Sequence, residues 1–376
     1  MKIAFVNDVV FQYATNSPDA EGGAERFQWL LARALAARGW SVHVAVTDML
    51  PAGHREVIDQ VVFNGVGRGP GHVLFNWYHF LLKERPTWWF WRCANHLWGP
   101  AVAMARTAGV RSIFSVGLDR DVIPRKALFR RPQLWPLYYW GLAQSDLLFV
   151  QHREQFNMLP QHWQKKAHLL PNMVGRPDNI VPHRERLPYV AWVAILRQVK
   201  RADLLIDIAR QLPDTRFVVC GGPSTFMSDP GYGETIVNAL RAQPNITYLG
   251  KVAPARALEI LANAAVCLST SDEEGFPNVF LEAWSVGTPV VSLRIDPDQV
   301  IERNGLGVVT GGSERTVATL RDLLEKPEKR DRIASRTRQF VNDHHSEQTV
   351  ANQFNQAVES SMIIRNSRDR IARQSH

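Results

Sequence analysis

The sequence predicts an α/β protein of two domains, each built on a mostly parallel sheet. Short apolar runs alternate with amphipathic helical stretches, which is the pattern of parallel strands joined by helical crossovers. The alternation stops between Pro171 and Pro188, where four prolines and many polar residues lie, and then restarts. In a chain of 376 residues, we expect Rossmann-like domains at 1–175 and 176–345. A C-terminal helix and tail, 346–376, can then pack back on the first domain.

The first domain starts with a strand, a helix and a second strand. We predict the strands at 2–6 and 40–46 and the helix at 24–38, where apolar residues share one helical face. Apolar runs at 112–116 and 147–150 extend the same sheet. Residues 51–98 show no clear periodicity, so no elements are predicted there.

The second domain repeats the alternation more regularly. Its predicted strands are 189–196, 216–220, 246–249, 265–268 and 289–292, and its predicted helices are 202–211, 255–264 and 277–286. The chain from about Arg315 is helical and charged. Because ligands bind at the carboxyl ends of parallel strands, we expect the two domains to face each other across a shared cleft.

The composition narrows the class of protein. Cys93, Cys220 and Cys267 give neither a disulfide framework nor a metal-ligand spacing, which favours a reducing cytoplasm. We see no secretory signal and no uninterrupted apolar run of the length that spans a bilayer.

One stretch of the first domain is unusually basic and rich in tryptophan. From Lys83 to Arg131 there are ten basic residues against three acidic ones, together with Trp88, Trp89, Trp91 and Trp98. Such a surface suits an anionic membrane interface, at the inner face of the cytoplasmic membrane. Alternatively, the tryptophans belong to the core and the arginines to a solvated face. No recognisable nucleic-acid-binding motif accompanies the charge, so we expect no nucleic acid partner.

Residues 274–283, with the sequence EGFPNVFLEA, carry the strongest local signal for a binding site. They follow a predicted strand and open a helix with Pro277 near its first position, where the missing N–H costs nothing. Gly275 allows a ligand to approach the backbone, and the helix start offers free N–H groups. Glu274 and Glu282 can face one ligand, and a carboxylate accepts paired hydrogen bonds from vicinal hydroxyls.

This segment resembles the paired-glutamate motif of retaining glycosyltransferases of GT-B fold, family 4. The resemblance implies that Glu274 contacts the donor sugar and that Glu282 holds the ribose of the nucleotide. It also implies that the residues between them, Gly275, Phe276, Pro277 and Asn278, line the donor site. A surface loop followed by an ordinary helix carboxylate is the alternative.

Four further segments resemble parts of the same family. Arg197 and Lys200 follow a predicted strand, and two cations there suit the donor diphosphate, as they do in the family. Gly22 and Gly23 resemble the family's glycine loop near the phosphates. Gly221 lies at a strand end that, in the family, lines the nucleotide site. The sequence 170–172, LPN, resembles the domain-junction motif.

The sequence departs from the family after the predicted strand 112–116. Many members have a histidine there, whereas this chain has Asp119 and Asp121, which we consider as substrate contacts instead. Asp119–Asp121 and Asp296–Asp298 both match an Asp-x-Asp metal pattern. Because Arg197 and Lys200 can supply the positive charge, we expect no metal and no cofactor beyond a UDP- or GDP-sugar co-substrate.

Taken with the resemblance, these features predict a retaining hexosyltransferase. Its donor is a nucleotide-diphosphate sugar, and its acceptor is a glycan or a lipid-linked glycan in surface polysaccharide or glycoconjugate synthesis. Arg197, Lys200 and Glu274 are the predicted catalytic residues. Two alternatives are a sugar-nucleotide epimerase of related fold and a non-catalytic nucleotide-sugar-binding protein.

Overall fold

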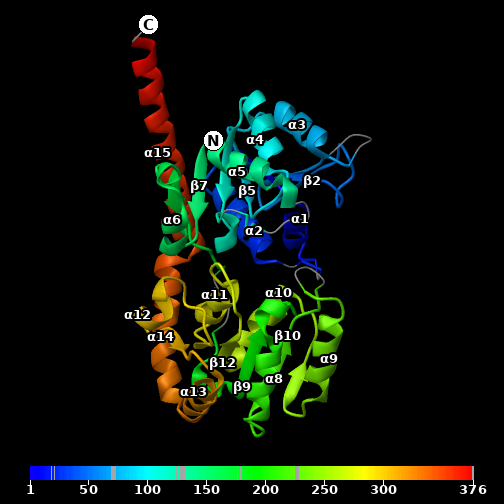
Figure 1. The fold of residues 1–376 in the computed structure, drawn as a ribbon, viewed down its shortest axis with the longest axis vertical. Helices are drawn as coiled ribbons and strands as arrows, with labels where there is room; N and C mark the ends of the chain where they lie inside the picture. The colour runs from blue at the N-terminus through cyan, green and yellow to red at the C-terminus, as the bar shows by residue number, and fades with distance from the viewer. Residues whose placement is uncertain are drawn as a thin grey trace. The chain divides into compact units, whose positions relative to one another are not determined.

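The structure is a computed structural model that describes residues 1–17, 19–20, 22–68, 73–123, 125–127, 132–175, 177, 180–224 and 228–374. The chain divides into two compact units, each of which is α/β (Figure 1). Unit 1 comprises Met1–Met173 and Glu347–His376, and unit 2 comprises Val174–Ser346. Arg176, the first residue of the expected second domain, lies outside the described residues.

Unit 1 is built on an eight-stranded sheet with the order β3-β4-β2-β1-β5-β6-β7-β8. Neighbouring strands are parallel except β3 and β4, which are antiparallel. The strands are β1 Lys2–Val6, β2 Ser41–Val46, β3 Arg55–Ile58, β4 Val61–Gly65, β5 Trp88–Arg92, β6 Arg111–Ser115, β7 Leu147–Val150 and β8 Ala167–Leu169. The α-helices are α1 Asp8–Ala14, α2 Gly23–Ala36, α3 Val73–Glu84, α4 Trp98–Thr107, α5 Trp135–Gln144, α6 Arg153–Met158, α7 Gln161–Gln164 and α15 Glu347–Gln374.

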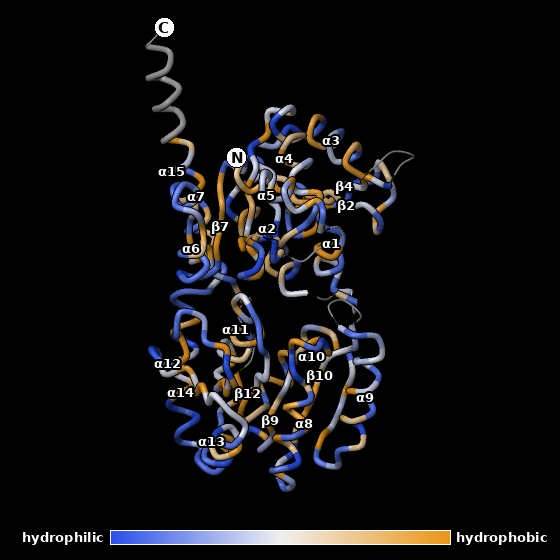
Figure 2. The backbone as a smooth tube through the Cα atoms, in the orientation of Figure 1, coloured by the Kyte–Doolittle hydropathy of each residue, from blue (hydrophilic) through white to orange (hydrophobic). Residues whose placement is uncertain are grey.

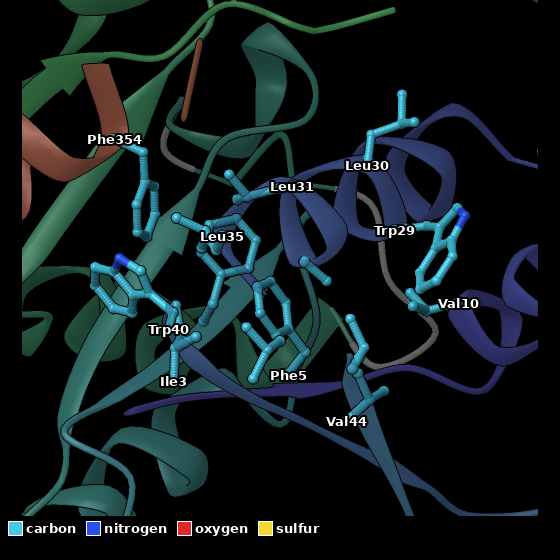
Figure 3. Close-up of a cluster of buried hydrophobic side chains, with 14 of the residues drawn as sticks. Ile3, Phe5, Val10, Trp29, Leu30, Leu31, Leu35, Trp40, Val44 and Phe354 are labelled. Atoms are coloured by element: carbon cyan, nitrogen blue, oxygen red, sulfur yellow. The ribbon is translucent and has the colours of Figure 1, made fainter. Parts of the chain in front are cut away.

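The core of unit 1 lies on both faces of this sheet. Alternate side chains of each strand point to opposite faces, so Phe5 and Phe90 join α1, α2 and α15 on one side. Trp89 and Phe114 join α3, α4 and α5 on the other. Figure 3 shows the first cluster, in which Phe354 of α15 lies beside Trp40 and shares the cluster with Ile3 and Phe5 of β1. The last helix of the chain therefore completes the core that the first strand begins.

The tryptophans of the basic stretch belong to this core. Trp88, Trp89, Trp91 and Trp98 are exposed by 1%, 0%, 8% and 0%. Three of them surround Trp77 or one another with ring centroids 5.4–6.4 Å apart. Their interpretation as a membrane interface is therefore wrong, because a fully enclosed indole cannot reach a lipid headgroup. Of the basic residues, Lys83, Arg85 and Arg106 are exposed, while Arg130 and Arg131 lie outside the described residues. No helix in the described ranges is both long and apolar enough to cross a bilayer.

Unit 2 contains a six-stranded sheet with the order β11-β10-β9-β12-β13-β14, in which every neighbouring pair is parallel. The strands are β9 Leu187–Val193, β10 Arg216–Cys220, β11 Ile246–Tyr248, β12 Ala264–Ser269, β13 Val290–Ser292 and β14 Gly307–Val309. The α-helices are α8 Ala202–Arg210, α9 Tyr232–Ala242, α10 Pro254–Asn263, α11 Asn278–Ser285, α12 Val300–Asn304, α13 Ser313–Glu325 and α14 Pro327–His344. In Figure 2 the strands are mostly hydrophobic and the helices carry hydrophilic outer segments. This order is that of dinucleotide-binding Rossmann folds, so the predicted fold class is confirmed.

Candidate functional site

The topology of unit 2 places its predicted site residues at one sheet position. The strand order reverses between β9 and its neighbour β12, and in such sheets ligands bind beyond the carboxyl ends at this reversal. The chain leaving β9 carries Arg197 and Lys200. The chain leaving β12 carries Glu274 and leads into α11, which contains Glu282. The predicted cations and carboxylates therefore follow adjacent strands.

The two loops that follow these strands are fastened to each other. The indole N–H of Trp192 on β9 donates to Thr270 Oγ1 at 3.0 Å, and Thr270 Oγ1 in turn donates to the Lys200 carbonyl at 2.7 Å. The backbone N–H of Asp272 donates to the carbonyl of Val199 at 2.9 Å. These buried or half-buried hydrogen bonds fix the loop after β9, which carries Arg197 and Lys200, against the loop after β12, which carries Glu274.

Lys200 and Glu274 form an ion pair between Nζ and Oε1. Their side chains are only 19% and 13% exposed, so solvent screens the pair less than it screens a surface pair. Lys200 and Glu274, which were predicted to bind different parts of one ligand, thus contact each other directly.

A second set of charges, which the sequence analysis did not identify, surrounds this pair. Asp272 accepts from Arg201 Nη1 at 3.0 Å and also pairs with Arg294, which follows β13. Arg201 also donates to Asp203, and these carboxylates raise the pKa of its guanidinium above its ordinary value. Arg201 adopts φ +51°, a conformation that these contacts maintain. The network joins the ends of β9, β12 and β13.

Helix α11 presents Glu282 on the side away from its core contacts. Phe280, Leu281 and Trp284 are fully buried, whereas Glu282 is half-buried. Pro277 is the N-cap of this helix, close to the predicted position. The side chain of Phe276, predicted to line the donor site, is 6% exposed and lies in the core against Trp284. Among the residues between the two glutamates, Asn278 is half-buried and Gly275 and Pro277 are buried.

Gly221 is explained by backbone packing. Its φ is +144°, and an added Cβ would lie 1.7 Å from the carbonyl oxygen of Ala194. Its own carbonyl accepts from Tyr248 Oη at 2.9 Å, and its N–H donates to Gly250 at 2.8 Å. Only glycine fits here, at the carboxyl end of β10, next to the position where β9 ends.

The glycine pair in unit 1 starts α2. Gly22 is the N-cap with φ +98°, and Gly23 is the first residue of the helix. The Glu25 carboxylate folds over Gly22, where an added Cβ would lie 2.1 Å from Oε2. Tyr13 Oη donates to the Gly22 carbonyl at 3.1 Å. Gly22 therefore starts the helix with a positive φ, and the Glu25 carboxylate lies against it.

Arg92, at the end of β5, is a buried cation that the sequence analysis did not identify. Its guanidinium donates to Ser115 Oγ at 2.8 Å and to Asn172 Oδ1 at 2.6 Å, and it lies 4.0 Å above the ring of Phe27. Burial lowers the pKa of this guanidinium. Asn172 belongs to the predicted junction motif, so Arg92 fixes that motif to the sheet of unit 1.

Asp119 and Asp121 have different surroundings within one 3₁₀ turn, η1 Asp119–Asp121. The Asp121 carboxylate is buried and accepts the N–H groups of Gly117 and Leu118 at 2.9 and 3.0 Å. Burial raises the pKa of Asp121 to about 6, and these bonds oppose the rise. Asp121 therefore holds its own loop. Asp119 is 29% exposed at its side chain and contacts His152 and Gln155.

The second Asp-x-Asp match is also part of local structure. Asp296 accepts the N–H of Ile301 at 2.7 Å and that of Glu302 at 3.3 Å, at the start of α12. Asp298 has φ +52°. The Asp296 carboxylate thus accepts two backbone N–H groups in the first turn of α12.

Most of the second unit is similar to one known protein family. Residues 177–340 match the family described as Glycosyl transferases group 1. The D-inositol 3-phosphate glycosyltransferase of Mycobacteroides abscessus is 30% identical over 139 residues, which are 36% of this chain and 31% of that protein. The enzyme of the same name from Rhodococcus jostii is 24% identical over 69% of this chain and 60% of its own length. The chain thus aligns with about a third to three-fifths of these relatives.

Solved structures share the fold over nearly the whole chain. Sucrose-phosphate synthase from Thermosynechococcus elongatus superposes with a TM-score of 0.78 at 17% identity, covering 97% of this chain and 100% of that one. HepE from Anabaena, solved with UDP and glucose, has a TM-score of 0.72 at 14% identity, covering 96% and 100%. Residues 177–340 thus resemble the glycosyl transferases group 1 family, and the fold is the GT-B fold of these solved structures.

Proposed function

We propose that this protein transfers a hexose-type sugar from a nucleotide-diphosphate sugar to a glycan or lipid-linked acceptor, with retention of anomeric configuration. One observation carries the proposal. The loops after β9 and β12 are bonded together at the strand-order reversal and bring Lys200 to Glu274. A cation suited to phosphate and a carboxylate suited to hydroxyls meet there, and Glu282 lies in the helix α11 that follows Glu274.

In this proposal Arg197 and Lys200 stabilise the leaving diphosphate. Cleavage of the anomeric C–O bond places negative charge on that group, and fixed cations lower the energy of the transition state more than that of the ground state. Glu274 positions the sugar and Glu282 binds the ribose. The leaving phosphate accepts the acceptor's proton, so no protein nucleophile is required. The two cations carry the charge that a metal ion carries in other designs, and we expect EDTA to leave activity unchanged.

The relatives' names support the substrate class. HepE binds UDP and glucose in its solved structure, and the curated relatives are glycosyltransferases that act on an inositol phosphate. We therefore propose UDP first among candidate nucleotides. We further propose that the acceptor binds unit 1 and that the reaction occurs in the cytoplasm. A lipid-linked acceptor would meet the enzyme at the inner face of the membrane through exposed cations such as Lys83, Arg85 and Arg106, not through the buried tryptophans.

The first test is thermal unfolding with UDP, GDP, ADP and their common sugar conjugates. At a ligand concentration one hundred times Kd, binding to the folded state adds about 2.7 kcal/mol to the free energy of unfolding. We expect one nucleotide series to stabilise the protein, and Glu282→Gln to remove most of that gain. Glu302→Gln is the matched control, because Glu302 is an exposed helix carboxylate in the same unit.

Product analysis then separates the enzyme classes. Transfer to an acceptor, or slow release of free sugar with retained configuration, supports the transferase. Epimerised donor identifies an epimerase, and binding without turnover across a broad acceptor panel identifies a binding protein. Absence of stabilisation by every nucleotide would contradict the donor site itself.

A further inference from the structure

We propose that Asp119 is an acceptor-binding residue of unit 1 and that His152 and Gln155 are positioning residues that hold its carboxylate. The ligand class is a polyhydroxylated sugar, and the inference rests on the proposed function. Asp119 follows strand β6, and His152 follows the neighbouring strand β7. Parallel pairing of β6 and β7 brings the two chain segments to the same edge of the sheet.

The contacts converge on one oxygen of Asp119. His152 Nε2 lies 3.2 Å from Asp119 Oδ1, and Gln155 Nε2 donates to the same oxygen at 2.9 Å. A carboxylate only accepts, so the imidazole nitrogen carries the proton in this bond. The loop after β6, which carries Asp119, is fixed as well, because the Gln151 side-chain amide donates to the carbonyls of Val116 and Gly117 at 2.9 and 2.7 Å.

The Asp119 carboxylate is more exposed than the polar side chains around it. Gln151, His152 and Gln155 are 5%, 4% and 0% exposed, whereas the Asp119 side chain is 29% exposed. Burying polar side chains is costly unless their hydrogen bonds are made. Here His152 and Gln155 contact the accessible Asp119 carboxylate, while Gln151 donates to the backbone carbonyls of the loop that carries it. A preoriented carboxylate loses little side-chain entropy when it accepts hydrogen bonds from vicinal hydroxyls. Asp121, two residues on, cannot serve in this way, since it is buried and holds backbone N–H groups.

The chain offers a matched control on the same two strands. Asp146 precedes β7 and accepts the N–H and Oγ of Ser112 at 2.9 and 3.2 Å. It is therefore a carboxylate between β6 and β7 at the amino end of the strands, opposite the proposed site. Its loss should weaken the fold without affecting acceptor binding.

The test measures binding of a set of methyl hexopyranosides to the full chain by saturation-transfer NMR titration, with UDP stabilisation recorded in parallel. We expect at least one glycoside to bind, and Asp119→Asn to weaken it at least tenfold, as the loss of a charge-assisted hydrogen bond implies. His152→Leu should have a similar effect. His152→Gln, which keeps an N–H near the Nε2 position, should restore binding to within threefold. Asp146→Asn should leave it unchanged.

The outcomes separate this inference from the proposed function. Normal UDP stabilisation in every variant, with glycoside binding lost only in Asp119→Asn and His152→Leu, supports the site. Equal loss in His152→Gln and His152→Leu would overturn the positioning role. UDP stabilisation without binding of any glycoside, or with binding unchanged in Asp119→Asn, would overturn the acceptor site while leaving the transferase in place. Failure of every nucleotide to bind would refute the proposed function instead.

Discussion

The ion pair between Lys200 and Glu274 predicts that stability and activity respond differently to the same substitutions. With the two side chains 19% and 13% exposed, the pair lies between a surface bridge, at about 0–1 kcal/mol, and a buried one, whose breakage costs about 3–5 kcal/mol. We expect Lys200→Met to lower the free energy of unfolding by about 1–3 kcal/mol, because it leaves the Glu274 carboxylate without its cation. Glu274→Gln should cost less, since an amide oxygen still accepts from Lys200.

The double variant, Lys200→Met with Glu274→Gln, should recover about 1–2 kcal/mol relative to the sum of the single changes. Activity should not recover. In the proposed mechanism Lys200 lies at the leaving group, so its loss should lower kcat about 100- to 1,000-fold, and the second substitution does not replace the charge. Urea unfolding followed by circular dichroism measures the first quantity, and donor turnover measures the second. Strictly additive stability changes, or turnover restored in the double variant, would refute this account of the pair.

Three further predictions concern the fold. Burial lowers the pKa of His183 from 6.5 to about 4. The stability that neutral His183 contributes is therefore fully present above pH 6.5 and is lost as the pH falls toward 4. Unfolding measured against pH should show the free energy of unfolding falling by about 2–3 kcal/mol over this range, and His183→Gln should abolish that fall. Arg186→Met should cost about 2–4 kcal/mol in the same assay, because this buried guanidinium serves four oxygen acceptors; a cost below 1 kcal/mol would contradict this. Gly22→Ala should lower Tm more than Gly39→Ala, since both have positive φ but only Gly22 lies against Glu25.

Most of the second unit could be predicted from its sequence. Each of its strands β9 to β13 is a short apolar run bounded by polar or glycine residues, and the structure places each within a few residues of the predicted bounds. The short strand β14 and helix α9 were not predicted. In the first unit, β5 was missed for a physical reason. Its sequence WWFWR is buried on both faces, and a central parallel strand then reads as a continuous apolar run. An aromatic run with arginines also typifies a membrane interface, and only the topology separates the two.

The candidate site was predictable in its parts but not in its pairings. Glu274, Lys200 and Arg197 lie in loops that follow predicted strands, so local pattern indicates them. That Lys200 and Glu274 contact each other depends on strand order across 74 residues, which no local pattern encodes. His152 directly follows a predicted strand, a signal that could have identified it. Its partner Asp119 is 33 residues away.

The return of α15 to unit 1 has a consequence for synthesis of the chain. Val350, Phe354 and Val358 are fully buried in the cluster that contains Ile3 and Phe5, so this core stays open until the last helix is made. Residues 174–346 are translated in between, which at about 5–20 residues per second takes about 9–35 seconds. During that interval the apolar face of unit 1 that α15 covers stays exposed. Unit 1 is therefore translated before unit 2, but its core is completed after unit 2.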